Sequence, residues 1–455
     1  MNGSAPRPAQ EPGPDLERLL RPLFHAAAPG GGAAVVVIRG DERTVACRGH
    51  SDRSSELPVR ADTRFELGSV TKTFTGLLLA EMAARGEVGY DDPIDRYLPA
   101  DAAPGYPHER PITLLHLATH TSGLPRLPVG LLPALAPRWF THPYATFGPA
   151  HLLRALPRTP VRGTPGVQVR YSNLGCGLLG LLLANAAGQR YDDLLEARVC
   201  RPLGLVDTSC GPGREDAAGY RRGRHVPSFR LPALPGAAAL RSTADDMLRY
   251  LQAHVALDAV PLPARADTDA LRTALGEVRR PRAGRRRGGP RICLGWNHRS
   301  VPVGARPGDA LRCDAPQGDA LAAGASSVGA LSARALSAGS PVESIPFGSV
   351  PFGPGLFEPV PFGSVPFGSV RGGAVAGEGE AGEVADEGSG ESADEVIYHA
   401  GATRGCTTFV GFSPRARVGL AVMSGTPPRR GRGFVRSAYD TLCTLVAERR
   451  EPMAV

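Results

Sequence analysis

Lysine is nearly missing from this sequence of 455 residues: of its 52 lysine and arginine side chains, all but Lys72 are arginine. Arginine stays protonated in proteins, whereas a lysine removed from water can give up its proton and act as a base. Because every other basic position holds arginine, the lysine at position 72 predicts chemistry that needs an amine.

Long apolar runs and cysteine motifs are also absent. No stretch of about 18 apolar residues occurs, so the sequence predicts no transmembrane helix and no membrane partner. Residues 1–14 are polar and proline-rich and lack the pattern of a signal peptide. The eight cysteines form no Cys-x-x-Cys pair, which argues against zinc and thioredoxin-like sites. We therefore expect a cytoplasmic protein with reduced thiols and a disordered segment over 1–14.

Dense charge of one sign occurs in one basic cluster, residues 279–287, within a chain of net charge +8. Such a cluster could contact nucleic acid or anionic lipid. No aromatic residues interleave it and no nucleic-acid motif accompanies it, so a solvated loop is favoured. We expect no nucleic-acid partner.

Helical and strand patterns are clear in the rest of the chain. Apolar spacing predicts helices at 15–28, 69–84, 174–188, 191–199, 243–254 and 433–449. Short apolar runs bounded by turn residues predict strands at 33–39, 43–48, 291–296, 406–412 and 417–424.

A segment of low complexity interrupts this pattern. The sequence Pro-Phe-Gly-Ser-Val occurs at 346–350, 361–365 and 366–370, and an acidic tract covers 377–395. The five-residue period is too short for a solenoid unit. Such a composition buries too little apolar surface to offset its ordering entropy. We expect residues 301–395 to form a disordered insert.

Two histidines, His116 and His120, lie four residues apart and could present metal ligands on one helix face. No Glu-x-x-His pattern and no third ligand follow, so local packing and hydrogen bonding are favoured. We expect no metal and no cofactor.

The first candidate site stretch is 65–74, which places Ser69 three residues before Lys72. Positions i and i+3 share a helix face. A neutral amine beside a hydroxyl is a base beside a nucleophile, and a helix start offers free N–H groups to an anion. Taken by itself, Ser-x-x-Lys is also typical of a capped surface helix.

Two further stretches carry candidate chemistry. In Tyr171-Ser172-Asn173, a tyrosine near an amine can exchange protons and an asparagine can orient an amide, although ordinary loop-to-helix junctions look similar. Small residues follow His399 in the stretch 399–405, where they would let a backbone N–H approach an oxyanion. The alternative there is a glycine-rich strand entry with a surface histidine.

Together and in this order, the three stretches resemble the serine β-lactamase-related superfamily. The similar branch contains class C β-lactamases, D-alanyl-D-alanine carboxypeptidases and related esterases. The resemblance extends over residues 65–99, 112–125, 164–205 and 399–424. It implies an acylated nucleophile, Ser69, with proton transfer shared by Lys72 and Tyr171. It also implies substrate contacts from Asn173, His399, Gly401 and Ala402, with the Ser69 and Ala402 N–H groups forming an oxyanion hole.

The fold that this resemblance implies is α/β and β-lactamase/transpeptidase-like. An antiparallel sheet is flanked by the terminal helices, and a mostly helical domain is inserted, with the site in the cleft between them. The sheet domain would comprise 15–75, 236–300 and 396–455, and the helical domain 76–235. The implied substrate is a small acyl compound.

Two departures from the family pattern bear on function. Position 399 is histidine, where β-lactamases of this branch carry lysine. A histidine is largely neutral at pH 7 and binds a carboxylate less tightly. Peptidase and esterase members carry histidine, so an esterase or peptidase-like substrate is favoured over a β-lactam. The insert is foreign to the family, and its position beside the third stretch suggests that it shades the site.

The alternative is a catalytically idle member of the same fold that binds ligands or partners, with the insert as its interaction segment. The intact set of Ser69, Lys72 and Tyr171 argues against it, since an idle site does not need these residues.

Overall fold

The computed structural model describes residues 11–26, 31–52, 54, 57–106, 110–131, 144, 146–213, 216–221, 224–256, 266–284, 289–301, 394–427 and 433–449. The disorder expected for residues 1–10 and for 302–393 falls outside this part of the chain.

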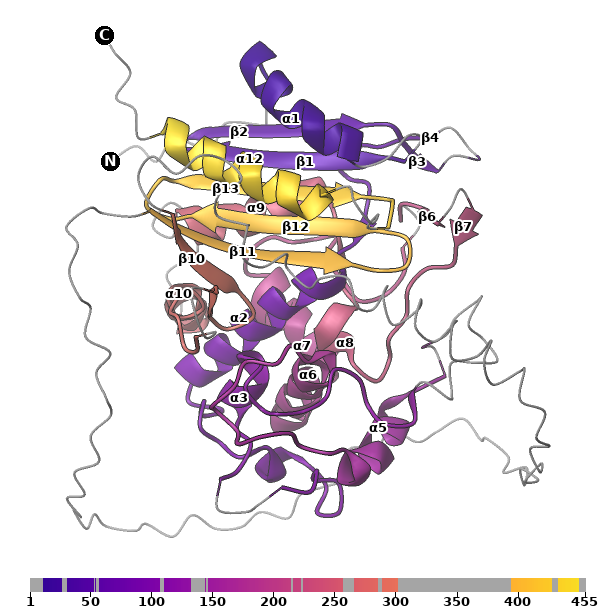
Figure 1. Cartoon of the computed structure of the whole chain (residues 1–455), viewed down its shortest axis with the longest axis vertical. Coiled ribbons are helices and arrows are strands. Elements are labelled where there is room, and N and C mark those ends of the chain that lie inside the picture. The colour runs from indigo at the N-terminus through magenta and orange to yellow at the C-terminus, as the bar shows by residue number, and fades with distance from the viewer. Residues whose placement is uncertain are drawn as a thin grey trace.

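A seven-stranded sheet with the order β2-β1-β13-β12-β11-β10-β9 forms the centre of the fold, and each neighbouring pair is antiparallel (Figure 1). Its strands are β1 Ala33–Arg39, β2 Glu42–Arg48, β9 Arg291–Ile292, β10 Asn297–Val301, β11 Asp394–Ala402, β12 Thr407–Ser413 and β13 Val418–Ser424. Strands from both ends of the chain pair within the sheet, because β1 lies beside β13 in the register Val36↔Ala421.

Both faces of the sheet are buried at strands β1, β12 and β13, which explains why these three strands are almost continuously apolar. Alternate residues of β1 enter two different clusters: Val35 and Val37 join one, and Val36 and Ile38 join the other. The terminal helices α1 (Pro14–Ala26) and α12 (Phe434–Glu448) cover the first face. Helix α9 (Ala244–Val255) packs on the second face, toward the larger core.

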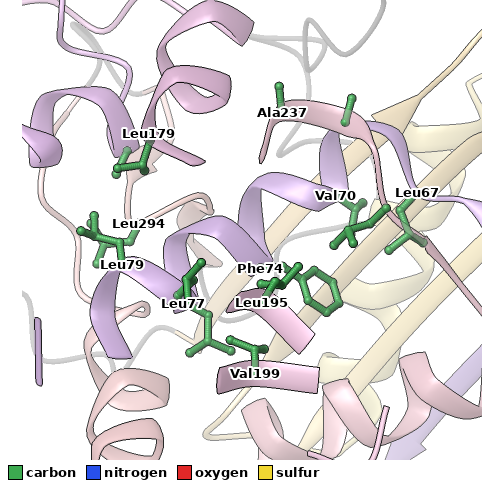
Figure 2. Packing of buried hydrophobic residues seen from close by; sticks show 14 of the residues in the cluster. Leu67, Val70, Phe74, Leu77, Leu79, Leu179, Leu195, Val199, Ala237 and Leu294 are labelled. Atoms are coloured by element: carbon green, nitrogen blue, oxygen red, sulfur yellow. The ribbon is translucent and has the colours of Figure 1, made fainter. Parts of the chain in front are cut away.

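Helix α2 (Thr71–Ala84) runs through that larger core. Every residue from Thr71 to Met82 is buried, including the charged side chains Lys72 and Glu81. Figure 2 shows its side chains Phe74, Leu77 and Leu79 with Val199 and Leu294, which other elements contribute to the same cluster. The expected domain boundary after residue 75 falls inside this continuous helix.

The helical part surrounds α2 on the side away from the terminal helices (Figure 1). Its helices are α3 Leu114–Ala118, α5 Pro149–Ala155, α6 Asn173–Ala187, α7 Tyr191–Leu195, α8 Pro235–Ala238 and α10 Ala266–Glu277. Turns of other helical types are η1 Gly68–Val70, η2 Ile94–Tyr97, η4 Leu156–Arg158 and η5 Glu196–Cys200. Two-stranded pairs are formed by β3 His50–Asp52 with β4 Leu57–Pro58, β5 Phe65–Glu66 with β8 Arg241–Ser242, and β6 Gly219–Arg221 with β7 Arg224–Val226.

Several sequence-based boundaries need correction. The strand expected at 291–296 is two strands separated by a turn at Gly295, where φ is +74°. A β-carbon at Gly295 would lie 2.2 Å from the Lys72 carbonyl oxygen, so the turn packs directly on the backbone of α2. Residue 14, assigned to the disordered N-terminus, begins α1.

The ends of the expected insert also differ from the structure, because Val301 pairs with Asp394 and Ser300 with Glu395 in the sheet. Residues 302–393 thus join two adjacent strands. The chain enters β11 at Asp394, and Ala402 lies at the other end of this strand. Eight residue steps at about 3.3 Å each separate these ends by about 26 Å. The insert joins β11 five residues, or roughly 16 Å, before His399, where the third stretch begins. That it shades the site stays a prediction.

Part of the basic cluster 279–287 is also less solvated than expected. Arg279 and Arg282 are half-buried, donating to the His254 carbonyl and to the Glu277 carboxylate respectively. Within the described residues, no helix combines the length and apolar character needed to cross a bilayer.

Candidate active site

Ser69 lies in the 3-10 turn η1, just before α2 begins at Thr71. The helix expected at 69–84 therefore begins as a 3-10 turn and becomes an α-helix at Thr71, and no side chain caps either η1 or α2. The turn follows from Gly68, whose φ is +52° and whose added β-carbon would lie 2.7 Å from the Ala402 nitrogen. Glycine thus allows the end of β11 to approach the segment that carries Ser69.

The Lys72 amine lies next to the Ser69 hydroxyl. Its Nζ is 3.0 Å from Ser69 Oγ and donates a second hydrogen bond of 2.7 Å to the Ala237 carbonyl, contributed by α8. The Lys72 side chain is fully buried and Ser69 is 4% exposed. The spacing of three residues therefore orients the two groups as the sequence predicted.

Tyr171 reaches the same serine from a distant part of the chain, with its hydroxyl 2.8 Å from Ser69 Oγ. The Lys72 Nζ lies 5.0 Å from the centre of the Tyr171 ring, and the Arg126 guanidinium carbon lies 5.2 Å from it. Ser69 Oγ therefore accepts hydrogen bonds from two groups, an amine and a phenol, both close enough to exchange a proton with it.

Asn173 is the first residue of α6, and Ser172 caps this helix by accepting a hydrogen bond of 2.8 Å from the Gly175 amide. The Asn173 side chain is 1% exposed, and neither its Oδ1 nor its Nδ2 has a hydrogen-bond partner within the described residues. A buried amide without partners costs about 1–3 kcal/mol. A ligand that carries its own amide would satisfy both atoms.

His399 is buried in β11, at 5% exposure, so the alternative of a surface histidine is wrong. Its Nδ1 lies 2.9 Å from the Ala400 carbonyl oxygen. Burial, together with the nearby charge of Lys72, lowers the pKa of His399 to about 3. The imidazole is therefore neutral at pH 7 and can hydrogen-bond to a substrate but not form an ion pair with it.

Gly401 and Ala402 close the site from the sheet side. A β-carbon at Gly401 would lie 2.0 Å from the Leu67 carbonyl oxygen and 3.0 Å from the Ser69 nitrogen. This close approach brings the end of β11 against the Ser69 turn, where the family resemblance implies two N–H groups facing one oxyanion.

His120 packs and hydrogen-bonds locally, as the sequence predicted, but its place beside Tyr171 was not expected. It is buried, has a φ of 60°, and its ring lies 4.5 Å from the Tyr171 ring between centroids. Its Nδ1 accepts a hydrogen bond of 3.3 Å from the Ser172 amide, so it holds the loop that presents Tyr171. His116 instead caps α3, accepting a bond of 3.2 Å from the Thr113 amide. The described residues contain no group of three His, Cys, Asp or Glu that could hold a metal ion.

Comparison with known families agrees with this geometry. The family model for Beta-lactamase matches residues 16–442, nearly the whole chain. The chain belongs to the Beta-lactamase family. Its antiparallel sheet with flanking helices confirms the expected α/β fold of the β-lactamase/transpeptidase type.

Curated relatives of this family member include three kinds of hydrolase. The D-alanyl-D-alanine-carboxypeptidase/endopeptidase AmpH of Escherichia coli is 31% identical over 254 residues, which are 53% of this chain and 62% of AmpH. A Beta-lactamase of Escherichia coli is 34% identical over 53% of this chain and 60% of the relative. Esterase EstB of Burkholderia gladioli is 31% identical over 49% of this chain and 65% of EstB.

The chain thus spans less than two thirds of the length of these relatives. Their names describe carboxypeptidase, β-lactamase and esterase activities, and family membership supports a serine hydrolase at this general level.

Proposed function

We propose that this chain is a serine acyl hydrolase that forms an acyl-enzyme at Ser69 and acts on an ester or a peptide-like amide. The observation that carries the proposal is the position of Ser69 Oγ, 3.0 Å from the Lys72 amine and 2.8 Å from the Tyr171 hydroxyl. A nucleophile in contact with a base, which is itself oriented by a third group, is the usual arrangement for covalent catalysis.

In the acylation step, Ser69 Oγ bonds to the substrate carbonyl carbon while its proton passes to the Lys72–Tyr171 pair. The carbonyl oxygen becomes an oxyanion, facing the Ser69 and Ala402 N–H groups. The bond to the leaving group then breaks, and the same pair returns the proton to the leaving oxygen or nitrogen. Water repeats these steps on the acyl-enzyme, releases the acid and restores the Ser69 hydroxyl.

Asn173 and His399 would bind the substrate rather than transfer protons. The unpartnered amide of Asn173 suits a substrate amide. His399 is neutral at pH 7, so it gives an anionic substrate group less attraction than a lysine would. This supports an ester, or an amide that binds without an ion pair, over a β-lactam.

Intact-mass spectrometry tests this proposal with a panel of aryl esters, peptides that end in D-amino acids, and β-lactams. We expect one acyl adduct per chain, with turnover of esters or peptides and a slower or stalled reaction with β-lactams. A chain that binds such compounds without any adduct would instead be the catalytically idle binder.

A further inference from the structure

Glu66 lies three residues before Ser69, at the end of β5, and its side chain is 12% exposed. Its two carboxylate oxygens contact different parts of the chain. Oε1 accepts from the Phe229 amide and lies 3.5 Å from both Arg241 Nη2 and the Ser228 hydroxyl. Oε2 accepts a hydrogen bond of 2.6 Å from the Thr403 hydroxyl.

The Oε1 side is a rigid support. The Arg241 side chain is 2% exposed and donates to the carbonyl oxygens of Cys210 at 2.9 Å and Phe229 at 2.7 Å. Its Nε also lies 3.3 Å from Asp216 Oδ2. A buried carboxylate bound to this many fixed donors has little freedom to reorient.

The Oε2 side controls the turn that follows β11. The Thr403 hydroxyl that donates to Glu66 accepts from the amides of Gly405 at 3.3 Å and Cys406 at 3.0 Å. The Thr403 amide donates 2.9 Å to the Cys406 carbonyl. Thr403 therefore sets the shape of the turn, and it directly follows Ala402.

A second tether runs beside this one, because the Thr408 hydroxyl donates 2.7 Å to the Leu67 carbonyl. Together the two bonds join the end of β11 and the start of β12 to residues 66 and 67. These residues lead into Gly68, the glycine that the Ala402 nitrogen approaches. Glu66 thus connects two backbone segments. It lies three residues before Ser69, and it bonds Thr403, which directly follows Ala402.

We propose that Glu66 is a positioning residue that holds the Ala402 amide in place for the oxyanion by clamping Thr403. This inference rests on the proposed acyl-enzyme mechanism. Removal of one oxyanion-hole donor typically costs about 10²–10³ in kcat. A loosened donor costs less, so loss of the clamp should lower kcat by roughly 10–100-fold with KM changed less than about 3-fold, because the donor acts mainly in the transition state.

The test compares Thr403→Val, which keeps the branched shape but removes the hydroxyl, with Thr403→Ser, which restores it. The kinetics are measured on an ester that the wild type hydrolyses. We expect Thr403→Val to show the loss in kcat, and Thr403→Ser to have a kcat within about 3-fold of wild type. Glu66→Gln offers a second variant, since an amide cannot accept hydrogen bonds on both sides, and it should lose kcat to a similar extent.

Ser228→Ala is the matched control. It removes a donor to the same carboxylate on the side away from Ala402, so it should lower the melting temperature while kcat stays within about 2-fold. Near-wild-type kcat in Thr403→Val, or equal kcat losses in Thr403→Val and Ser228→Ala, would make the clamp purely structural and overturn the inference. A wild type without turnover on any of the panel substrates would overturn the proposed function itself, and the inference with it.

Discussion

Lys72 Nζ and Ser69 Oγ lie 3.0 Å apart, and the second bond of the amine goes to the Ala237 carbonyl. The Lys72 side chain is 1% exposed, so its amine is almost completely shielded from solvent where it contacts the serine. This contact accounts for a lysine at position 72, because an arginine there could not give up a proton to the serine.

Lys72→Arg tests the need for a deprotonable amine. Arginine keeps the charge but cannot release its proton near neutral pH, so kcat/KM should fall by about 10²–10⁴, the usual value of acid–base assistance. The measurement is the acylation rate against pH for both proteins, with melting temperature as the check on folding. Near-wild-type rates with the same pH profile would leave Lys72 as a structural support.

Tyr171→Phe removes the hydroxyl that lies 2.8 Å from Ser69 Oγ and leaves the ring between His120 and Arg126. Because the packing is kept, we expect a loss of about 10²–10⁴ in kcat/KM with a small change in melting temperature. If the whole loss in kcat/KM came from a higher KM, with kcat unchanged, Tyr171 would only contact the substrate.

Gly401→Ala tests the close approach between β11 and the Ser69 turn. The new β-carbon would lie 2.0 Å from the Leu67 carbonyl, so the strand end must shift and the Ala402 amide with it. We expect a loss of about 10²-fold or more in acylation rate, as for a lost oxyanion donor. Gly105→Ala is the control, since nothing lies within 4 Å of its added β-carbon, and it should leave the rate unchanged.

Replacing residues 302–393 by Asn-Gly joins β10 to β11 directly, and this dipeptide suits a two-residue hairpin. Val301 and Asp394 are already paired, so we expect folded protein with a similar melting temperature. Turnover should stay within about 2-fold, since the junction lies about 26 Å along β11 from Ala402. Loss of folding would show that the segment is structural, and a large rise in turnover would show that it covers the site.

His254 makes the protein sensitive to acid. Burial, with a smaller contribution from Arg279, holds the pKa of His254 well below its ordinary 6.5. Near pH 6 and below, the unfolded chain therefore binds a proton that the folded chain does not. His254 therefore does not lower the free energy of unfolding above about pH 6.5. Below that pH it lowers this free energy by up to about 1.4 kcal/mol per pH unit.

His254→Phe removes this proton and suits an aromatic site beside Trp296 and Phe412. Neither nitrogen of His254 has a partner within the described residues, so no hydrogen bond there is lost. Urea unfolding from pH 8 to pH 5 should give a shallower pH dependence for the variant. Parallel curves for the two proteins would contradict the assignment.

The site was predictable from sequence where its chemistry is local. Ser69 and Lys72 lie on one turn, so their contact follows from helical spacing. The contact of Tyr171 with Ser69 spans 102 residues and was expected only through the family resemblance. Local sequence patterns do not show which distant segments of a chain will come into contact.

Other features depend on backbone geometry that composition does not encode. His120 adopts a positive φ to support Ser172, which no spacing rule predicts for a histidine. From the residues alone, a surface histidine at 399 stayed open as an alternative to a substrate contact, and only the burial of strand β11 decides against it. The sequence placed the start of α2 at Ser69 rather than Thr71, because the positive φ of Gly68 accompanies a close approach to Ala402. These two segments lie more than 300 residues apart in the sequence.

The central claim is that Ser69 is the nucleophile, and labelling with a fluorophosphonate tests it most directly. Wild type, Ser69→Ala and Lys72→Arg are each treated at pH 7 and digested, and the modified peptide is identified by mass spectrometry. The account predicts one adduct on Ser69 in the wild type, none in Ser69→Ala at an unchanged melting temperature, and much slower labelling of Lys72→Arg. An adduct on another residue, or equal labelling of Ser69→Ala, would contradict it.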